Sequence, residues 1–232
     1  MKTILCTKWG TKYDGYELKL YDKVKPWCDK FYCITDNPVN DFDIKMPDLF
    51  GDQPGFFTYQ KLYQFDEDLV GIEGDKFLAF DLDVLIHNSI EPLWDLDEPY
   101  ILQSKWQDPY LTHKNWGRNR SVTINSSLIR WDRGQCLPVF NDVVKHKDYT
   151  FFTYYGLDNY LTRRFHKIGE DKCFFKFFPK GIAYSWYKGN VWPDDMEIRK
   201  LRPDHMICMF NNSCIDIPDE DLHEIPELRG QW

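Results

Sequence analysis

The sequence of 232 residues contains no run of basic side chains, and its formal net charge is -8. A nucleic-acid duplex or an anionic membrane surface is attracted mainly by clustered lysine and arginine residues. The composition therefore argues against either as the main partner. If the chain binds an anionic substrate, the negative charge has to be neutralised locally, by a cation or by a few placed hydrogen-bond donors.

The sequence also lacks a segment suited to secretion or to a membrane. No apolar run reaches transmembrane length, and the one in the N-terminal "MKTILCTKWG" is too short for the hydrophobic region of a signal peptide. The seven cysteines are odd in number, include no CxxC pair and often lie in apolar runs, where free thiols usually just pack. These features predict a cytoplasmic chain without a transmembrane segment.

No internal repeat, low-complexity block or linker divides the chain, so a single domain over residues 1–232 is expected, with an irregular acidic tail over residues 215–232. Hydrophobic residues make up 43% of the sequence, which suits a packed core. Aromatic residues make up 17%. Such rings can stack on bases or sugars, but they more often fill a core.

Apolar runs and helical spacing alternate along the chain. Short apolar runs predict strands over residues 3–7, 31–35 and 76–80, and again over 99–104, 121–131, 173–178, 182–186 and 205–210. Helical spacing indicates helices over residues 16–27, 135–145 and 156–165, and within residues 52–69. This alternation predicts an α/β fold, a sheet flanked by helices, with ligands at the carboxyl edge of the strands.

Two aspartates follow directly on the third apolar run, in "KFLAFDLDVLI". Residues two apart on a strand project to the same face, so Asp81 and Asp83 can converge on one point while Leu82 turns into the protein. Two carboxylates in this arrangement suit Mg²⁺ or Mn²⁺, which commonly also bind substrate phosphates. The alternative is a pair of solvated aspartates at a strand end.

The same letters allow a second enzymatic interpretation. "FDLDVLI" resembles the first motif of haloacid-dehalogenase-like phosphatases, in which the first aspartate attacks phosphorus. Those proteins carry the motif near the N-terminus and usually continue with Gly-Thr. In this chain Val84 and Leu85 follow, about eighty residues of α/β pattern precede, and no later lysine and paired-acid motif is found.

Several segments together resemble GT-A glycosyltransferases, specifically the group of glycogenin-like and lipopolysaccharide galactosyl- and glucosyltransferases. The first matches, in the family's order, are "CTKWGTKY", "FYCITDNP" and "YQKLYQF". The first resembles the strand and loop that hold the nucleotide, the second carries an aspartate near the base, and the third carries a lysine that approaches the donor. The residues so implied in donor binding are Thr7, Lys8, Trp9, Gly10, Tyr13, Asp36 and Lys61.

The later matches are "FLAFDLDVLIHNSIEPLW", "INSSLIRW" and "YGLDNYL". The resemblance implies that Asp81 and Asp83 bind the metal ion, that Asn125 lies near the donor sugar, and that Asp158 presents a carboxylate to it. Where family members supply a His-Gly pair as a further metal ligand, this chain has Asn211 and Asn212 after "HMICMF". Asn211 is the candidate third ligand, and His205 is expected to be structural.

The resemblance implies a nucleoside-diphosphate-sugar donor, more specifically a UDP-sugar, a Mn²⁺ or Mg²⁺ cofactor, and transfer of a hexose to a hydroxyl of a glycan or similar acceptor. Retention at the anomeric carbon is implied by the glycogenin-like group. The departures at Asn211 and in the Asp158 segment, where Gly156 and Leu157 stand, leave a catalytically inert binder of sugars or nucleotide-sugars as an alternative.

Two loops are candidate walls of the site. The stretch "SWYKGNVWPDD" carries Trp186 and Lys188, which are expected to close over the diphosphate. The stretch "QSKWQDPYLTHKNWGRNR" is rich in tryptophan and arginine, and either clamps an acceptor or only covers a loop. Its side chains for an acceptor are Trp106, Trp116, Arg118 and Arg120.

Overall fold

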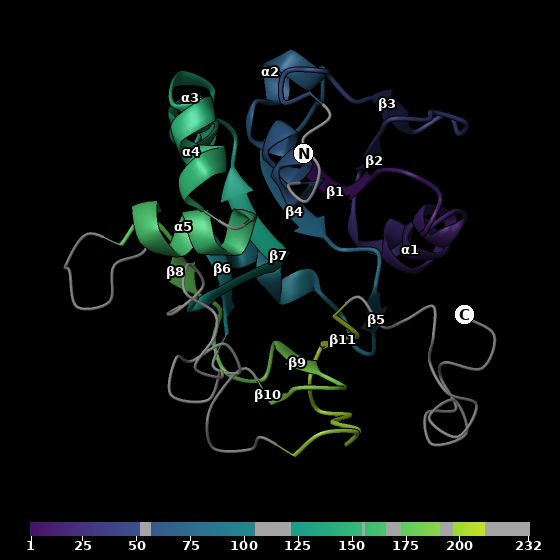
Figure 1. The fold of residues 1–232 in the computed structure, drawn as a ribbon. Coiled ribbons are helices and arrows are strands. Elements are labelled where there is room, and N and C mark those ends of the chain that lie inside the picture. Colours follow the sequence, from purple (N-terminus) through teal and green to yellow (C-terminus); the bar gives the residue numbers. More distant parts are fainter. Residues whose placement is uncertain (52–56, 105–121, 155, 166–172, 191–196, 212–232) are drawn as a thin grey trace.

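A seven-stranded mixed sheet forms the centre of the computed structural model, which describes residues 1–51, 57–104, 122–154, 156–165, 173–190 and 197–211. The order of its strands is β3-β2-β1-β4-β7-β6-β8 (Figure 1). In chain order the strands are β1 (Lys2–Lys8), β2 (Lys30–Thr35), β3 (Asp43–Lys45), β4 (Lys76–Phe80), β6 (Tyr100–Gln103), β7 (Ile124–Asp132) and β8 (Lys176–Phe177).

The direction of β7 decides what meets at the carboxyl end of β4. Strands β3, β2, β1 and β4 pair in parallel, whereas β7 runs antiparallel to β4, with Phe80 opposite Leu128. The first residues of β7 therefore lie beside the last residues of β4. Residues 124–128 and the segment that follows Phe80 are brought to the same edge of the sheet.

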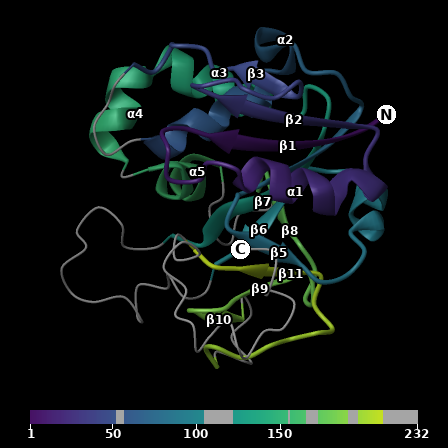
Figure 2. The ribbon, with the colours of Figure 1, turned by 90° about the vertical axis from the view of Figure 1, so that its right-hand side faces the viewer.

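A second, four-stranded sheet has the order β10-β9-β11-β5. Its strands are β5 (Val84–Ile86), β9 (Ala183–Ser185), β10 (Gly189–Asn190) and β11 (Ile207–Met209). In both Figure 1 and Figure 2 it lies below the large sheet. The chain passes from β4 in the large sheet to β5 in the small one through residues 81–83.

Helices cover both faces of the large sheet because successive strand residues point to opposite sides. Leu5, Phe77 and Ala79 belong to one core cluster, and Ile4, Cys6 and Leu78 belong to another. The first cluster includes residues of η2 (Phe57–Phe65), α2 (Glu67–Val70), α3 (Leu137–Lys145), α4 (Lys147–Thr153) and α5 (Leu157–Phe165). The second includes residues of α1 (Tyr16–Val24), η1 (Lys25–Trp27) and η3 (Glu91–Asp95).

The mixed α/β fold expected from the sequence is confirmed. The helix predicted within residues 52–69 is present in the described part of that stretch as the 3₁₀ helix η2 followed by the short α2. The sequence did not predict β3, β5, β10 or α4 as separate elements. The expected irregular tail over residues 215–232 lies outside the described residues. Within the described part of the chain, no helix is both long enough and apolar enough to span a membrane.

Candidate functional site

An ion pair between Lys61 and Asp81 lies where the chain leaves β4. The Lys61 ammonium, from η2, contacts Oδ1 of Asp81, and the two side chains are 13% and 22% exposed. The other carboxylate oxygen, Oδ2, accepts a hydrogen bond of 2.8 Å from the Ser127 hydroxyl. Both oxygens of Asp81 therefore have protein partners from two different elements.

The antiparallel pairing of β4 and β7 places the first residues of β7 beside Asp81. The Asp81 amide donates to the carbonyl oxygen of Ser127 at 3.0 Å, which continues the ladder past the end of β4. The side-chain oxygen of Asn125 accepts from the Ser127 amide at 3.1 Å, and Oδ1 of Asp158 accepts from the Ser126 amide at 3.0 Å. Asn125 and Asp158 are thus fixed on the same short stretch of backbone that fixes Asp81.

Asp83 lies in the link between the two sheets. Leu82 is buried in the core cluster that contains α1, as the sequence predicts, and the Asp83 side chain is buried as well. The Phe210 amide, directly after β11, donates to the Asp83 carbonyl oxygen at 2.9 Å. The two aspartates follow β4 in a bend rather than standing on a strand, and both act electrostatically on Lys61.

The charges of Lys61 and of the three carboxylates around it act electrostatically on one another. Burial lowers the pKa of Lys61, but the carboxylates of Asp81, Asp158 and Asp83 outweigh it, so the pKa is raised and the lysine stays protonated. Burial raises the pKa of Asp158, and the neighbouring Lys61 charge only partly offsets this. Asp158 is therefore a carboxylate whose charged form is poorly compensated.

The small sheet contributes Asn211, Ser185 and Lys188. The Ser185 hydroxyl donates to the side-chain oxygen of Asn211 and accepts from the Lys188 amide at 3.2 Å. Asn211 has a left-handed backbone, with φ of 52°, directly after the residue that bonds to Asp83. Lys188 is exposed, but protein atoms lie around its ammonium group. This burial lowers the pKa of Lys188, and the negative charges of Asp158 and Asp83 offset the shift only in part.

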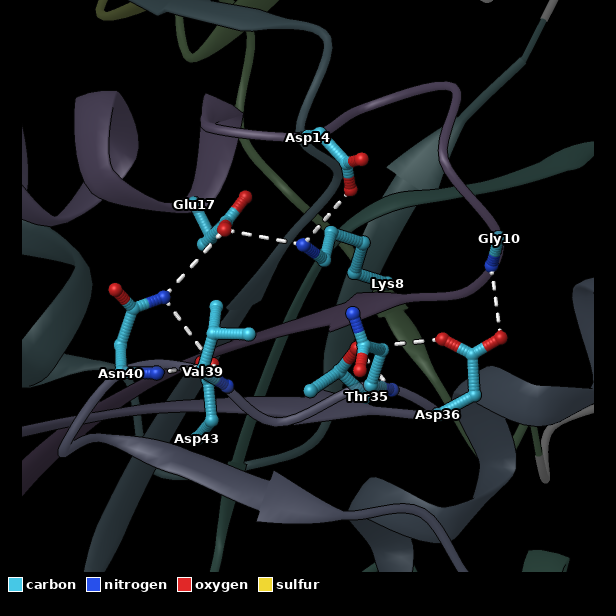
Figure 3. Close-up of polar contacts among 10 residues, drawn as sticks. Lys8, Gly10, Asp14, Glu17, Thr35, Asp36, Val39, Asn40 and Asp43 are labelled. Carbon is cyan, nitrogen blue, oxygen red and sulfur yellow. Dashed lines mark hydrogen bonds and ion pairs between the residues drawn. The ribbon is translucent and has the colours of Figure 1, made fainter.

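A second group of predicted residues lies where β1 and β2 end (Figure 3). The Gly10 amide donates to Oδ2 of Asp36 at 2.9 Å, so this carboxylate ties the loop after β1 to the end of β2. Gly10 has a φ of 63°, which favours glycine. The loop predicted to hold the nucleotide is therefore fixed to the neighbouring strand.

Lys8 has its partners inside the protein. Its side chain is buried, and the ammonium lies 3.0 Å from Oε1 of Glu17 and 3.2 Å from Oδ1 of Asp14, both pointing toward it in Figure 3. Burial lowers the Lys8 pKa, but Glu17 and Asp14 reverse the direction and raise it. Its charge is thus already balanced, which suits a support for the loop better than a phosphate ligand.

The other residues predicted for donor binding lie around this loop. Thr7 is buried on β1, and its hydroxyl has no protein partner among the described residues. Trp9 packs against the core cluster of η2 and α3, while Tyr13 packs against the cluster of α1. Strand β1 pairs in parallel with β4, with Cys6 opposite Phe80, so this loop and the Asp81 region leave neighbouring strands at the same edge of the sheet.

The structure describes part of one of the two loops predicted as walls of the site, and none of the side chains considered in the other. The prediction that Trp186 closes over a ligand is wrong in this structure, because its side chain is buried in the core of the small sheet. His205 is buried against Tyr184, and its Nδ1 lies 3.2 Å from Asp204, as expected of a structural histidine. The four loop residues considered for an acceptor lie outside the described residues: Trp106, Trp116, Arg118 and Arg120.

Sequence reasoning missed two serines. Ser127 bonds to Asp81, and Ser185 bonds to Asn211, so each hydroxyl fixes a predicted metal ligand. The signal for Ser127 was present in "INSSLIRW", because an antiparallel strand that follows the aspartate pair brings its first residues to the same edge. Without the register of β7 against β4, that serine cannot be distinguished from any other.

The oxygen donors at this edge fit a hard divalent cation. Asp81 and Asp83 offer carboxylates and Asn211 an amide carbonyl, which are ligands that Mg²⁺ and Mn²⁺ accept. Among the residues that the structure describes, no three or more His, Cys, Asp or Glu side chains gather in a group able to hold a metal ion. A ligand set here therefore depends on the neutral oxygen of Asn211 or on water for its third position.

Comparison with solved structures identifies the fold. The galactosyltransferase LgtC, solved with donor and acceptor sugar analogues, superposes with a TM-score of 0.61 at 14% identity, covering 99% of this chain and 100% of that one. A glycosyltransferase that glycosylates the major capsid of PBCV-1 gives 0.58 at 12% identity, over 97% and 99%. Mouse xyloside xylosyltransferase 1 gives 0.57 at 10% identity, over 92% and 99%.

At these identities the likeness shows the fold alone, which is the GT-A fold that these glycosyltransferases share. No protein-family model matches the sequence, and the curated proteins contain no significant match.

Proposed function

We propose that this chain, with its GT-A fold, is a metal-dependent glycosyltransferase that moves a hexose from a nucleoside-diphosphate sugar to a hydroxyl of a glycan or similar acceptor. The observation that carries the proposal is the ion pair of Lys61 with Asp81 at the carboxyl edge of β4, with Asp83 two residues further on and Asp158 held by the neighbouring Ser126 amide. Acidic and basic groups are paired there in a protein whose net charge is -8. The fold of the three glycosyltransferases described above supports the same assignment.

The chemistry explains why such a cluster is useful. When the glycosidic bond of the donor breaks, the diphosphate leaves with an additional negative charge, and groups that compensate this charge lower the barrier. A divalent cation held by Asp81, Asp83 and Asn211 supplies Lewis-acid stabilisation of those phosphate oxygens when it is bound. The Lys61 ammonium provides a second positive charge beside the same position, and Lys188 a third from the small sheet.

The remaining residues have positioning roles in this proposal. Asn125 and Asp158, whose side chains accept from the Ser127 and Ser126 amides of β7, are assigned to face the donor sugar, with Asp158 as the carboxylate presented to it. The loop of Thr7, Trp9, Gly10 and Tyr13, held by Asp36, takes the nucleoside. We assign no general base, because a retaining transfer, which the glycogenin-like resemblance implies, does not require one.

LgtC has been solved with both a donor and an acceptor sugar analogue. Because this chain covers the whole length of LgtC with the same fold, we infer that it also takes a donor and an acceptor, and that the donor carries UDP. The UDP assignment, like the retention of configuration, rests on the resemblance of the motifs.

A catalytically inert binder of the same ligands is the second candidate. It is favoured by two observations: both oxygens of Asp81 are held by the protein, and the third ligand position carries Asn211, whose oxygen already accepts from Ser185. The phosphatase alternative is not favoured, because its aspartate motif belongs near the N-terminus and here joins β4 to β5.

The direct test incubates the protein with a panel of nucleotide-sugars and Mn²⁺ and follows release of the nucleoside diphosphate. Slow hydrolysis of one donor without an acceptor supports the transferase. Thermal stabilisation by UDP without any turnover supports the inert binder. Release of inorganic phosphate from phosphomonoesters would instead support the phosphatase.

Substitution of the proposed metal ligands gives the first prediction. Asp83→Ala should abolish the stabilisation of the protein by UDP that depends on Mn²⁺, because Asp81 and a neutral amide hold a divalent cation poorly against water. Asn211→Ala should retain part of the effect. Thermal unfolding with UDP, with and without Mn²⁺, measures both variants. Wild-type stabilisation in Asp83→Ala would contradict the metal assignment, and equal loss in both variants would give Asn211 the same weight as the aspartate.

A further inference from the structure

Lys61 and the proposed cation share one ligand atom. The ammonium contacts Oδ1 of Asp81, while Oδ2 is held by the Ser127 hydroxyl at 2.8 Å. A divalent cation that binds Asp81 through Oδ1 meets the lysine at the same oxygen. Two positive charges at that distance repel each other, and the repulsion is strong because both side chains are mostly buried.

A lysine side chain ordinarily carries its charge near neutral pH. The conflict is therefore relieved when another group of negative charge takes over the ammonium. The diphosphate of a donor is such a group, since its oxygens accept charge-assisted hydrogen bonds from an ammonium and also bind the cation.

We propose that Lys61 exchanges partners during donor binding: it holds Asp81 in the free protein and passes to the diphosphate when the divalent cation takes Asp81. This inference rests on the proposed function. Its consequence is that the cation and the nucleoside diphosphate bind as a coupled pair, each weakly alone and each tightly in the presence of the other. The linkage is reciprocal, as any coupling between two ligands must be.

Ser127 makes the exchange possible without movement of the carboxylate. Its hydroxyl and its backbone carbonyl both bond to Asp81, to Oδ2 and to the amide nitrogen respectively. Asp81 therefore keeps its position when Oδ1 changes from the ammonium to the cation. Ser127 acts as a positioning residue, and hydroxyls of this kind typically change metal affinity about 10–100-fold when removed.

Calorimetric titration with Mn²⁺, with and without saturating UDP, tests the exchange. In the wild-type protein, UDP should raise the affinity for Mn²⁺ by at least about tenfold, within the usual range of coupling between sites. Lys61→Met has a side chain of similar length without charge. It should bind Mn²⁺ alone more tightly than the wild type, by about fivefold or more, and UDP should raise its Mn²⁺ affinity by a smaller factor than in the wild type, because only the direct contact of the diphosphate with the cation remains.

Three controls separate the exchange from other causes. Lys176, on β8, forms an exposed ion pair with Glu98, and Lys176→Met removes the same charge there and should behave like the wild type. Ser127→Ala should weaken Mn²⁺ binding equally with and without UDP, leaving the coupling intact. Lys61→Gln repeats the measurement with a polar residue should the methionine variant fail to fold.

The outcomes distinguish this inference from the proposed function. If wild-type protein binds UDP but takes up Mn²⁺ equally well without it, or if both Lys61 variants match the wild type, the exchange is wrong and the transferase assignment stands. If UDP and the other nucleoside diphosphates, GDP, CDP and ADP, all fail to bind with or without Mn²⁺, the proposed function fails and the exchange fails with it.

Discussion

Asp158 shows how a single residue can reduce the stability of the fold at the place where the proposed reaction occurs. Burial raises the pKa of this carboxyl more than the Lys61 charge lowers it, so the folded protein holds its charged form at a cost. One oxygen accepts from the Ser126 amide, a bond that an asparagine in its place can retain. Stability therefore does not account for the charge at this position, and the role that we propose for it is binding of a sugar donor.

The second prediction follows from the sign of this shift. Between the ordinary carboxyl pKa of 3.8 and the raised folded value, the folded protein binds more protons than the unfolded chain, so stability falls as the pH rises through this interval. At pH 7, Asp158→Asn should raise the free energy of unfolding by about 1 kcal/mol, because it removes a poorly compensated charge. Below the ordinary pKa both proteins are neutral here, and the difference should disappear.

Urea unfolding at pH 7 and at pH 3.5 measures this difference. Asp41→Asn, at an exposed position, is the matched control and should change stability little at either pH. A variant Asp158→Asn that is less stable than the wild type at pH 7 would show that the attraction to Lys61 exceeds the cost of burial.

The sequence indicates Asp81 and Asp83 as candidate metal ligands, because two carboxylates directly behind an apolar run need a compensating partner. It does not identify Ser127 or Ser185. A serine is compatible with every exposed position. The value of these two comes from a hydrogen bond of 2.8 Å between β7 and the residue after β4 in one case, and from a bond between β9 and the second residue after β11 in the other. Both depend on strand register, which single-residue patterns do not contain.

At the scale of elements, the turn before β4 fixes how this strand enters the large sheet. The Thr3 hydroxyl donates to the Glu73 carbonyl at 2.6 Å, and the Asp75 amide donates to the Met1 carbonyl at 3.0 Å, so the turn is tied to the start of β1. A Cβ atom on Gly74 would lie 2.5 Å from Thr3 Oγ1 and 2.8 Å from Phe77. The turn therefore has room for glycine alone.

The third prediction compares two glycines. Gly74→Ala should lower the free energy of unfolding by about 1–3 kcal/mol, because the Thr3 hydroxyl and the Phe77 ring must shift to admit the methyl group. Gly134→Ala, at a φ of 76° with no atom within 4 Å of the added carbon, should show only the backbone cost of about 1–2 kcal/mol. Urea unfolding ranks the two. If Gly74→Ala is the milder change, the turn shifts more easily than these contacts indicate.

The longer elements could be predicted, and the short ones could not. β4 coincides with the apolar run at 76–80, and α5 begins within one residue of its predicted start. β3, β5 and β10 have two or three residues, too few for a period to show. Only His146 separates the last residue of α3 from the first residue of α4. Helix α4 also exposes Tyr149 and Phe152, so its sequence lacks the usual polar face.

At the scale of the whole molecule, the thiols report on the integrity of the fold. The described cysteines are all free, and Cys6, Cys33, Cys136 and Cys208 are buried. Burial raises the pKa of Cys208 to about 12 and that of the partly exposed Cys28 to about 11, so few thiolates are present near neutral pH. The thiols that the sequence predicts to pack in apolar runs are therefore also expected to react slowly.

The fourth prediction concerns these thiols. At pH 8 the four buried cysteines should resist a disulfide reagent in the native protein, whereas all seven cysteines of the chain should react in strong denaturant. Colorimetric counting of released thiolate, with and without denaturant, gives both numbers. Rapid reaction of more than three thiols in the native protein would mean that one of the core clusters opens readily under native conditions.

The link of residues 81–83 joins the two sheets covalently, and the Phe210 amide bonds to it from the small sheet while Ser127 bonds to it from the large one. A donor held through both aspartates would therefore attach to the one segment that both sheets already grip, so its binding would brace the small sheet against the large one.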